Sequence, residues 1–288
     1  MLINKMDNNK KQSRVLVNVL GIPLLLSAIY FGGIYFQCLI FIAIIMSTFE
    51  LNAMCLKKNI QIQLLPIFLF YIYLFLTHLF ESISVSIEIL IFWSLLILSF
   101  EVFRKKVKPI ENIAISILGM VWIGLFMNSI VSIRYIDTGW DISGGMYTLL
   151  MFLSVWICDS AAFIFGSKFG KTKILPNISP NKTWVGAVSG AISVFIFTII
   201  VAFFIFFPNH GLDYYFPILT ALILTLIFGV IGQIGDFVES MIKRQFGVKD
   251  SGTSLKGHGG FLDRMDSLML AAPSFYLFLK YSLRDIIG

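Results

Sequence analysis

Three aspartates lie where apolar runs meet polar stretches in the C-terminal half of the chain. Asp236 follows directly on an apolar run, and Asp263 and Asp266 come three residues apart at the start of the last apolar run. Residues at i and i+3 share one face of a helix. Carboxylates grouped without histidine or cysteine are the hard oxygen ligands that Mg²⁺ prefers. The three aspartates therefore indicate a magnesium site.

Basic side chains accompany these aspartates in larger number than three carboxylates require. The surplus indicates a further anionic guest, most simply phosphate groups. Carboxylates, Mg²⁺ and clustered Lys and Arg together are typical of phosphoryl or nucleotidyl transfer. The basic residues between positions 236 and 266 are Lys243, Arg244, Lys249, Lys256, His258 and Arg264.

A second polar stretch, residues 167–183, offers another site for an anion. It ends in Ser179-Pro180-Asn181-Lys182-Thr183, and Thr183 can cap the helix that follows. The backbone N–H groups at that helix N-terminus, together with Lys182, form an anion cradle. Asp159 lies inside the preceding apolar run, where an acid is functional by default, although pairing with Lys182 also explains it.

The composition indicates what kind of element holds these residues. Of 288 residues, 58% are hydrophobic and only 13% are charged, whereas soluble domains carry about 25% charged residues. So much apolar side chain excludes disorder. The three cysteines have no cysteine or histidine nearby, which excludes a disulfide framework and a zinc site. We expect an all-α, polytopic integral membrane bundle of about nine transmembrane helices.

The chain divides into apolar runs of the length that crosses a bilayer, about 20 residues. We expect a basic cytoplasmic N-terminus at 1–14, N-terminal transmembrane helices over 15–133, and a C-terminal catalytic region over 144–283 with cytoplasmic loops 167–183 and 236–264. Gly32 and Gly33 separate the first two runs, which form a tight hairpin or one broken helix. The runs are 15–33, 34–55, 64–81, 84–103, 110–133, 144–166, 184–207, 215–235 and 265–283.

Basic residues orient this bundle, because Lys and Arg concentrate in cytoplasmic loops. With a cytoplasmic N-terminus, all of the 22 Lys and Arg except Arg134, Lys280 and Arg284 fall on the cytoplasmic side. We therefore expect the cell (inner) membrane, a cytoplasmic active site and a C-terminus on the opposite side. The net charge of +6 suits a leaflet of anionic lipid and gives no reason to expect nucleic acid as a partner.

The stretch from Ser240 to Asp266 resembles the signature of the phosphatidate cytidylyltransferases, also called CDP-diacylglycerol synthases. The resemblance extends over roughly residues 155–283 and includes the Ser179–Thr183 segment. Val185 departs from it, because the family commonly has Glu in the segment after that run. The signature positions are Ser240, Lys243, Arg244, Lys249, Asp250, His258, Gly259, Gly260, Asp263, Arg264 and Asp266.

This resemblance implies that CTP and phosphatidate react to give CDP-diacylglycerol and pyrophosphate, in a homodimer embedded in the lipid bilayer. It implies a paired metal centre of Mg²⁺ and a second cation such as K⁺, bound by Asp236, Asp263 and Asp266. Lys243 and Arg264 join these three as the expected catalytic residues. The expected substrate-binding residues are Ser179, Lys182, Ser240, Arg244, Lys249, His258, Gly259, Gly260 and Asp159.

Other functions fit parts of the sequence. An enzyme of the same superfamily that makes CDP-archaeol, or a CTP-dependent polyprenol kinase, needs similar residues. A secondary transporter would use the acids as an ion site, but such proteins often show two similar halves, and here the polar residues concentrate in one. The aspartates also fit an interfacial salt-bridge set with Lys243 and Arg264.

Two further patterns predict structure and no chemistry. Gly166 with Gly170, and Gly186 with Gly190, have the spacing of small residues at helix–helix contacts. The glutamates in the N-terminal half lie near the ends of apolar runs, where snorkelling or contact with water explains them. These glutamates are Glu50, Glu81, Glu88 and Glu101.

Overall fold

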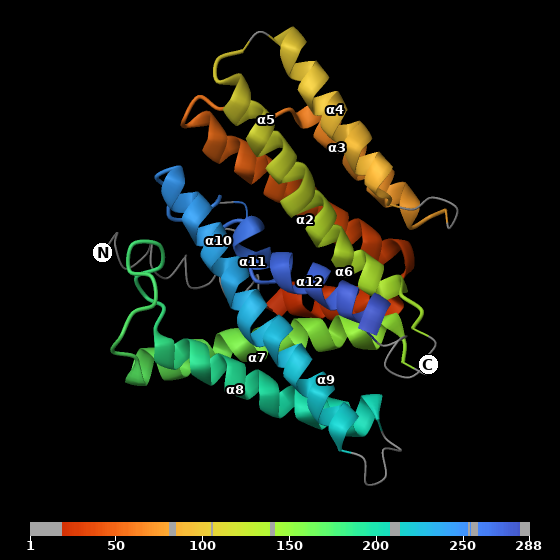
Figure 1. Cartoon of the computed structure of the whole chain (residues 1–288), viewed down its shortest axis with the longest axis vertical. Helices are drawn as coiled ribbons and strands as arrows, with labels where there is room; N and C mark the ends of the chain where they lie inside the picture. The colour runs from red at the N-terminus through yellow and green to blue at the C-terminus, as the bar shows by residue number, and fades with distance from the viewer. Residues whose placement is uncertain are drawn as a thin grey trace. The chain divides into compact units, whose positions relative to one another are not determined.

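The computed structural model describes an almost entirely helical chain (Figure 1). Within the described part there is no strand, only an isolated antiparallel bridge between Lys173 and Thr183. Five of the described helical segments are long and apolar enough to cross a membrane, and three apolar helices are shorter. The expected all-α membrane bundle is confirmed, while the number of nine spans stays a prediction. The described residues are 19–80, 85–104, 106–138, 142–207, 214–252, 254 and 259–282.

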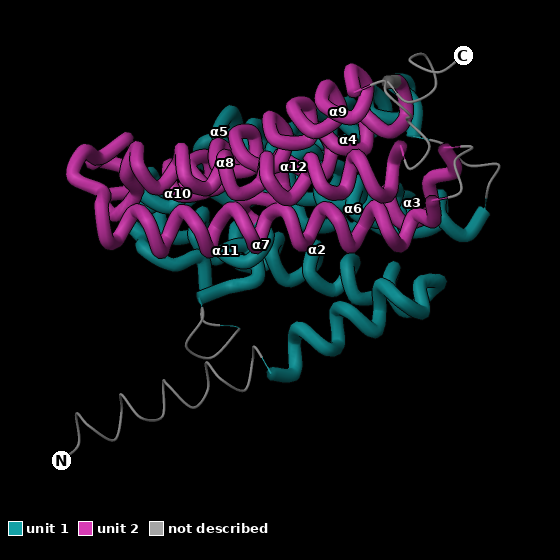
Figure 2. The backbone as a smooth tube through the Cα atoms, turned by 90° about the horizontal axis from the view of Figure 1, so that it is seen from below, with its two compact units in different colours: residues 1–132, 243–265 teal, residues 133–242, 266–288 magenta. Residues whose placement is uncertain are grey.

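The chain forms two compact units (Figure 2). The N-terminal unit contains Met1–Ser132 and Lys243–Met265, and the C-terminal unit contains Ile133–Ile242 and Asp266–Gly288. The sequence placed loop 236–264 with the C-terminal region. In the structure, most of this loop belongs to the unit of the N-terminal helices.

The N-terminal unit starts with a helix over Val19–Phe31, which ends at Gly32. Gly32 has a φ of 62°, a left-handed conformation that glycine adopts without strain, and α2 begins directly after it. The two expected spans are therefore separate helices. The helices that follow Val19–Phe31 are α2 (Gly33–Leu56), α3 (Leu64–Thr77), α4 (Ile87–Arg104), α5 (Pro109–Leu118), the π-helix η1 (Gly119–Leu125) and α6 (Phe126–Tyr135), whose end from Ile133 belongs to the C-terminal unit.

Tyr71 of α3 anchors the core of this unit. Its side chain is buried, and its hydroxyl lies 2.8 Å from Thr48 Oγ1 and donates to the Gly119 carbonyl at 3.2 Å. A Cβ at Gly124 would overlap the Tyr71 ring, so only glycine fits there. Side chains that insert against a helix are a common cause of irregular turns, which explains the π-helix η1 at this contact.

The C-terminal unit is built on an aromatic core. The rings of Phe228 and Phe275 meet edge to face at 5.0 Å, and Tyr147 lies 6.3 Å from Phe275, a favourable arrangement of aromatic quadrupoles. The helices of this unit are α7 (Gly144–Phe169), α8 (Trp184–Val201), η2 (Ala202–Phe206), α9 (Tyr215–Thr225), η3 (Leu226–Ile231), α10 (Gly232–Gln245), α12 (Leu268–Leu277) and η4 (Phe278–Ser282). The end of α10, from Lys243, belongs to the N-terminal unit, as does the short helix α11 (Leu262–Met265).

Small residues allow α7 and α8 to lie side by side in this unit (Figure 1). A Cβ at Gly186 would lie 2.8 Å from the Ala162 carbonyl oxygen and 3.3 Å from the Gly166 Cα. A Cβ at Gly190 would likewise lie 3.0 Å from the Cys158 carbonyl oxygen. The predicted packing role of these glycines is confirmed, since any larger residue pushes the two helices apart.

Gly186→Ala is expected to lower the free energy of unfolding by about 1–3 kcal/mol, the usual cost of overpacking. The measurement is thermal unfolding of the detergent-solubilised protein. Gly21→Ala is the matched control, because a Cβ there meets nothing within 4 Å. An equal shift of the unfolding midpoint temperature in the two variants would show that the contact between α7 and α8 is not tight.

The distribution of polar side chains is the reverse of that in a soluble protein. Large apolar residues are exposed along the helices, with Phe103 82% and Phe204 76% exposed. On α10, Glu239 and Lys243 are only 0% and 9% exposed, whereas Met241 is 50% exposed. Lipid favours this arrangement, because charged side chains inside a bilayer face the interior of the bundle.

Candidate active site

A cavity of about 520 Å³ opens among α7, α8, α10 and the loop 170–183, all within the C-terminal unit. Four charged residues line it, two acidic and two basic: Asp159, Asp236, Lys173 and Lys182. Asn181 and Gln233 add polar groups, and Phe163 adds an apolar wall. A concave site with a few convergent polar groups is typical of ligand binding.

The loop 170–183 folds back on itself and so brings Lys182 to this cavity. Ile174 N–H donates to the Lys182 carbonyl at 3.2 Å, and Trp184 N–H donates to the Thr172 carbonyl at 3.1 Å. Thr183 Oγ1 accepts a hydrogen bond from Gly186 N–H at 3.2 Å, which confirms the predicted helix cap. The cap and the paired backbone hold Lys182 directly before the first turn of α8.

Lys182 forms an ion pair with Asp236, at 2.5 Å between Nζ and Oδ2. The ammonium also lies 4.3 Å from the centre of the Phe237 ring, a cation–π contact. Ser240 Oγ donates to Asp236 Oδ1 at 3.4 Å, from one turn further along α10. Asp159 lines the same cavity, so two carboxylates and two lysines meet at the site.

Asp266 lies between α11 and α12, outside the apolar helix Leu268–Tyr281. Its Oδ1 accepts a hydrogen bond from Ser267 N–H at 2.6 Å. Burial raises the pKa of the Asp266 carboxyl, and the nearby carboxylate of Asp236 raises this pKa further. Asp236 and Asp266 therefore repel each other when both are ionised, and a cation bound to them would relieve the repulsion.

This pair fits the way in which proteins hold magnesium. Among the residues that the structure describes, no three His, Cys, Asp or Glu side chains form a group that holds a metal by itself. Mg²⁺, however, usually binds to one or two carboxylates, water and substrate phosphates, and not to a cage made by the protein alone. The magnesium site at Asp236 and Asp266 needs only such a pair, and it stays a prediction.

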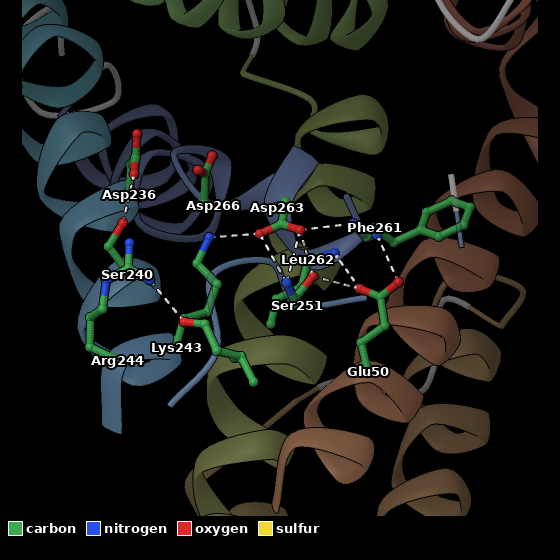
Figure 3. Close-up of polar contacts among 12 residues, drawn as sticks. Glu50, Asp236, Ser240, Lys243, Arg244, Ser251, Phe261, Leu262, Asp263 and Asp266 are labelled. Atoms are coloured by element: carbon green, nitrogen blue, oxygen red, sulfur yellow. Dashed lines mark hydrogen bonds and ion pairs between the residues drawn. The ribbon is translucent and has the colours of Figure 1, made fainter. Parts of the chain in front are cut away.

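Asp263, in the N-terminal unit, has its oxygens occupied by the chain (Figure 3). Lys243 Nζ lies 2.6 Å from Oδ1, and Oδ2 accepts hydrogen bonds from Ser251 N–H at 3.0 Å, Ser251 Oγ at 2.9 Å and Gly260 N–H at 2.8 Å. These contacts fill most of the roughly four acceptor positions of a carboxylate. Asp263 thus ties the loop after α10 together, and its assignment as a metal ligand stays a prediction.

The remaining predicted residues that the structure describes differ in their exposure to solvent. Arg244, Lys249 and Arg264 are exposed, and the Arg244 guanidinium donates to the Val248 carbonyl at 2.8 Å. Ser179 forms a turn, in which its carbonyl accepts from Lys182 N–H at 3.3 Å. Gly259 has a left-handed φ of 78° beside the buried Gly260. His258 and Lys256 lie outside the described residues.

Glu50 of α2 departs from the prediction made from the sequence. Its side chain does not snorkel to the interface: the residue is only 6% exposed, and it accepts hydrogen bonds from Ser251, Ser254, Phe261 and Leu262 (Figure 3). The prediction that snorkelling or contact with water explains this acid was therefore wrong, and it was also wrong for Glu101 of α4, which is 4% exposed. An acid inside an apolar run is a candidate for function by default, but the same local pattern also fits a side chain that reaches the interface.

Comparison with known proteins places this chain in a family. The sequence profile described as the cytidylyltransferase family matches residues 12–282. The chain belongs to the cytidylyltransferase family. It is therefore a nucleotidyltransferase, and its site lies in a helical membrane bundle.

Individual relatives of this cytidylyltransferase-family chain carry a more specific name. A protein of Bacillus subtilis (strain 168) is 33% identical over 273 residues, which are 93% of this chain and 97% of that protein. A protein of Staphylococcus haemolyticus (strain JCSC1435) is 38% identical over 68% of this chain and 70% of that protein. One from Staphylococcus aureus (strain COL) is 35% identical over 69% and 71%. All three are named phosphatidate cytidylyltransferase.

Proposed function

We propose that the chain is a CTP:phosphatidate cytidylyltransferase of phospholipid biosynthesis. A phosphatidate oxygen attacks the α-phosphorus of CTP, the bond to the β-phosphate breaks, and CDP-diacylglycerol and pyrophosphate form. The observation that carries this proposal is the similarity to the Bacillus subtilis phosphatidate cytidylyltransferase over 93% of the chain. The charged cavity supports it, because its lysines suit phosphates and its position among membrane helices suits a lipid substrate.

The chemistry requires charge neutralisation more than proton transfer. Phosphatidate is already an anion near pH 7, so its attacking oxygen needs no general base. The barrier is the approach of two polyanions, which basic side chains lower by neutralising and aligning the phosphates. In this proposal Lys173 and Lys182, which line the cavity, perform this task. Because Lys182 pairs with Asp236, its ammonium is already oriented before a substrate binds.

Asp236 and Asp266 would hold Mg²⁺ in this proposal. When bound, the ion supplies a positive charge that stabilises the phosphate oxygens during transfer. The mutual repulsion of the two carboxylates supports the assignment, since a divalent cation removes it. A second cation such as K⁺ rests on the family resemblance alone.

The proposed location is the cell (inner) membrane, with the N-terminus and the active site on the cytoplasmic side. The positions of Lys and Arg between the apolar runs support this orientation. The acyl chains of phosphatidate then remain in the bilayer while the head group reaches the cavity. A homodimer is proposed from the family resemblance.

The test is an assay of the detergent-solubilised protein with phosphatidate and CTP labelled at the α- or the γ-phosphate. We expect the α-label in the lipid product and the γ-label in pyrophosphate. Removal of Mg²⁺ by a chelator is expected to abolish the reaction, and added Mg²⁺ to restore it. Label from the γ-phosphate in the lipid would identify a kinase instead. An unlabelled lipid under all conditions would overturn the proposal.

A further inference from the structure

Glu50 connects the N-terminal helices to the loop that carries the signature residues. Both of its oxygens accept hydrogen bonds from this loop (Figure 3). Oε1 accepts from Ser254 Oγ at 2.7 Å and from Phe261 N–H at 3.0 Å. Oε2 accepts from Ser251 Oγ and from Leu262 N–H, both at 3.0 Å. The donors lie 201 to 212 residues later in the chain, yet they belong to the same compact unit as Glu50.

These four donors are neutral groups around a buried carboxylate. A buried charge is costly unless hydrogen bonds replace its lost hydration. The carboxylate is therefore stable inside the unit only while the loop keeps the conformation that aims two hydroxyls and two backbone N–H groups at it. In turn, the backbone N–H groups of residues 261 and 262 donate to Glu50.

Two glycines of the loop make room for this carboxylate. A Cβ at Gly260 would overlap Glu50 Oε2 and Ser251 Oγ, and a Cβ at Gly252 would lie 2.7 Å from Glu50 Oε1. The resemblance to the family implied that Gly260 binds substrate. The close approach to Glu50 explains a glycine at this position by packing.

The contacts of Glu50 continue directly to the Asp263–Lys243 ion pair. Ser251 Oγ lies 3.0 Å from Glu50 Oε2 and 2.9 Å from Asp263 Oδ2, so the two carboxylates share the single proton of this hydroxyl. Gly260 N–H donates to Asp263 at 2.8 Å, and Lys243 Nζ lies 2.6 Å from Asp263. A change at Glu50 is thereby transmitted to Asp263 and Lys243 through a single residue.

We propose that Glu50 is a positioning residue for nucleotidyl transfer. Its carboxylate fixes the conformation of the loop after α10 and, through Ser251, the placement of Asp263 and Lys243. The N-terminal helices, which carry no signature motif, then contribute to the reaction by supplying this carboxylate from α2. The role in catalysis rests on the proposed function, whereas the role in ordering the loop does not.

Glu50→Gln tests the proposal at constant size, because an amide NH₂ donates and cannot accept from the loop donors. Whichever way the amide faces, one backbone N–H loses its acceptor, and the serine hydroxyl on that side can only accept from the amide NH₂. We expect faster hydrogen–deuterium exchange at the amides of Ser251, Gly252 and residues 260–262. We also expect kcat per folded molecule to fall by about 10- to 100-fold, since small displacements of positioned groups cost rates of this order. Glu50→Asp keeps both acceptor oxygens and should restore part of the protection and of the rate.

Glu101→Gln is the matched control in the same unit. Glu101 is 4% exposed and accepts hydrogen bonds from Gln63 at 2.8 Å, Asn112 at 2.7 Å and Arg104 at 2.9 Å, away from the loop. We expect this variant to lower thermal stability while loop exchange stays unchanged and kcat stays within about twofold.

These measurements test the positioning role of Glu50 separately from the proposed function. Unchanged loop exchange in Glu50→Gln, or the same exchange pattern in Glu50→Gln and Glu101→Gln, overturns the positioning role. Equal rates of Glu50→Gln and wild type overturn its connection to catalysis. A wild-type protein that makes no CDP-diacylglycerol contradicts the proposed function, and loop exchange still tests Glu50 because it needs no substrate.

Discussion

Asp236→Asn is expected to lower the rate of CDP-diacylglycerol formation by about 100- to 1,000-fold, the usual effect of removing one preorganised charge from an active site. The substitution removes the ion-pair partner of Lys182 and one carboxylate of the pair with Asp266. Lys182 then loses its orientation, and the pair proposed for Mg²⁺ loses half of its charge. The measurement is kcat with labelled CTP over a range of Mg²⁺ concentrations.

Asp137→Asn is the control, because Asp137 is an exposed aspartate of the same unit outside this cavity. We expect it to keep its activity within about twofold, as exposed substitutions away from a site usually do. Partial rescue of Asp236→Asn by high Mg²⁺ would show that metal affinity is the property lost. Full activity of Asp236→Asn at low Mg²⁺ would contradict both the metal assignment and the role of the Lys182 ion pair.

Asp263→Asn should cost stability as well as activity. Both side chains of the Lys243–Asp263 pair are only 11% exposed, and loss of one partner from a buried pair costs about 3–5 kcal/mol. The amide NH₂ of the asparagine would also face the N–H and O–H groups of the loop, and it cannot accept hydrogen bonds from them. We expect the free energy of unfolding to fall by about 3 kcal/mol. We expect kcat per folded molecule to fall by about 100-fold, since Lys243 is displaced.

Hydrogen exchange decides which role Asp263 has. If Asp263 orders the loop, Asp263→Asn increases exchange at Ser251 and Gly260 in the same way as Glu50→Gln. Unchanged exchange with a raised Mg²⁺ requirement would instead support the metal role implied by the family resemblance. Asp250→Asn is the control in the same loop, because Asp250 is exposed, and we expect it to change stability by less than about 0.5 kcal/mol.

Much of this protein could be predicted from local sequence. Low charge and long apolar runs indicated a helical membrane bundle, because a helix satisfies its own backbone hydrogen bonds inside lipid. The Thr183 cap depends on neighbouring residues, and it was predicted correctly. The spacing of residues from Ser240 to Asp266 was enough to indicate the family, which the match over residues 12–282 then established.

What the sequence could not show are the contacts between residues far apart in the chain. An acid in an apolar run has the same local pattern whether it snorkels or is buried, so Glu50 was misjudged until its partners 201 to 212 residues later were known. The ion pair of Lys182 with Asp236 and the hydrogen bonds that occupy Asp263 likewise depend on how helices pack. Hydrogen bonds and charge pairs act over a few ångströms of space, whereas sequence patterns report only a few neighbours along the chain.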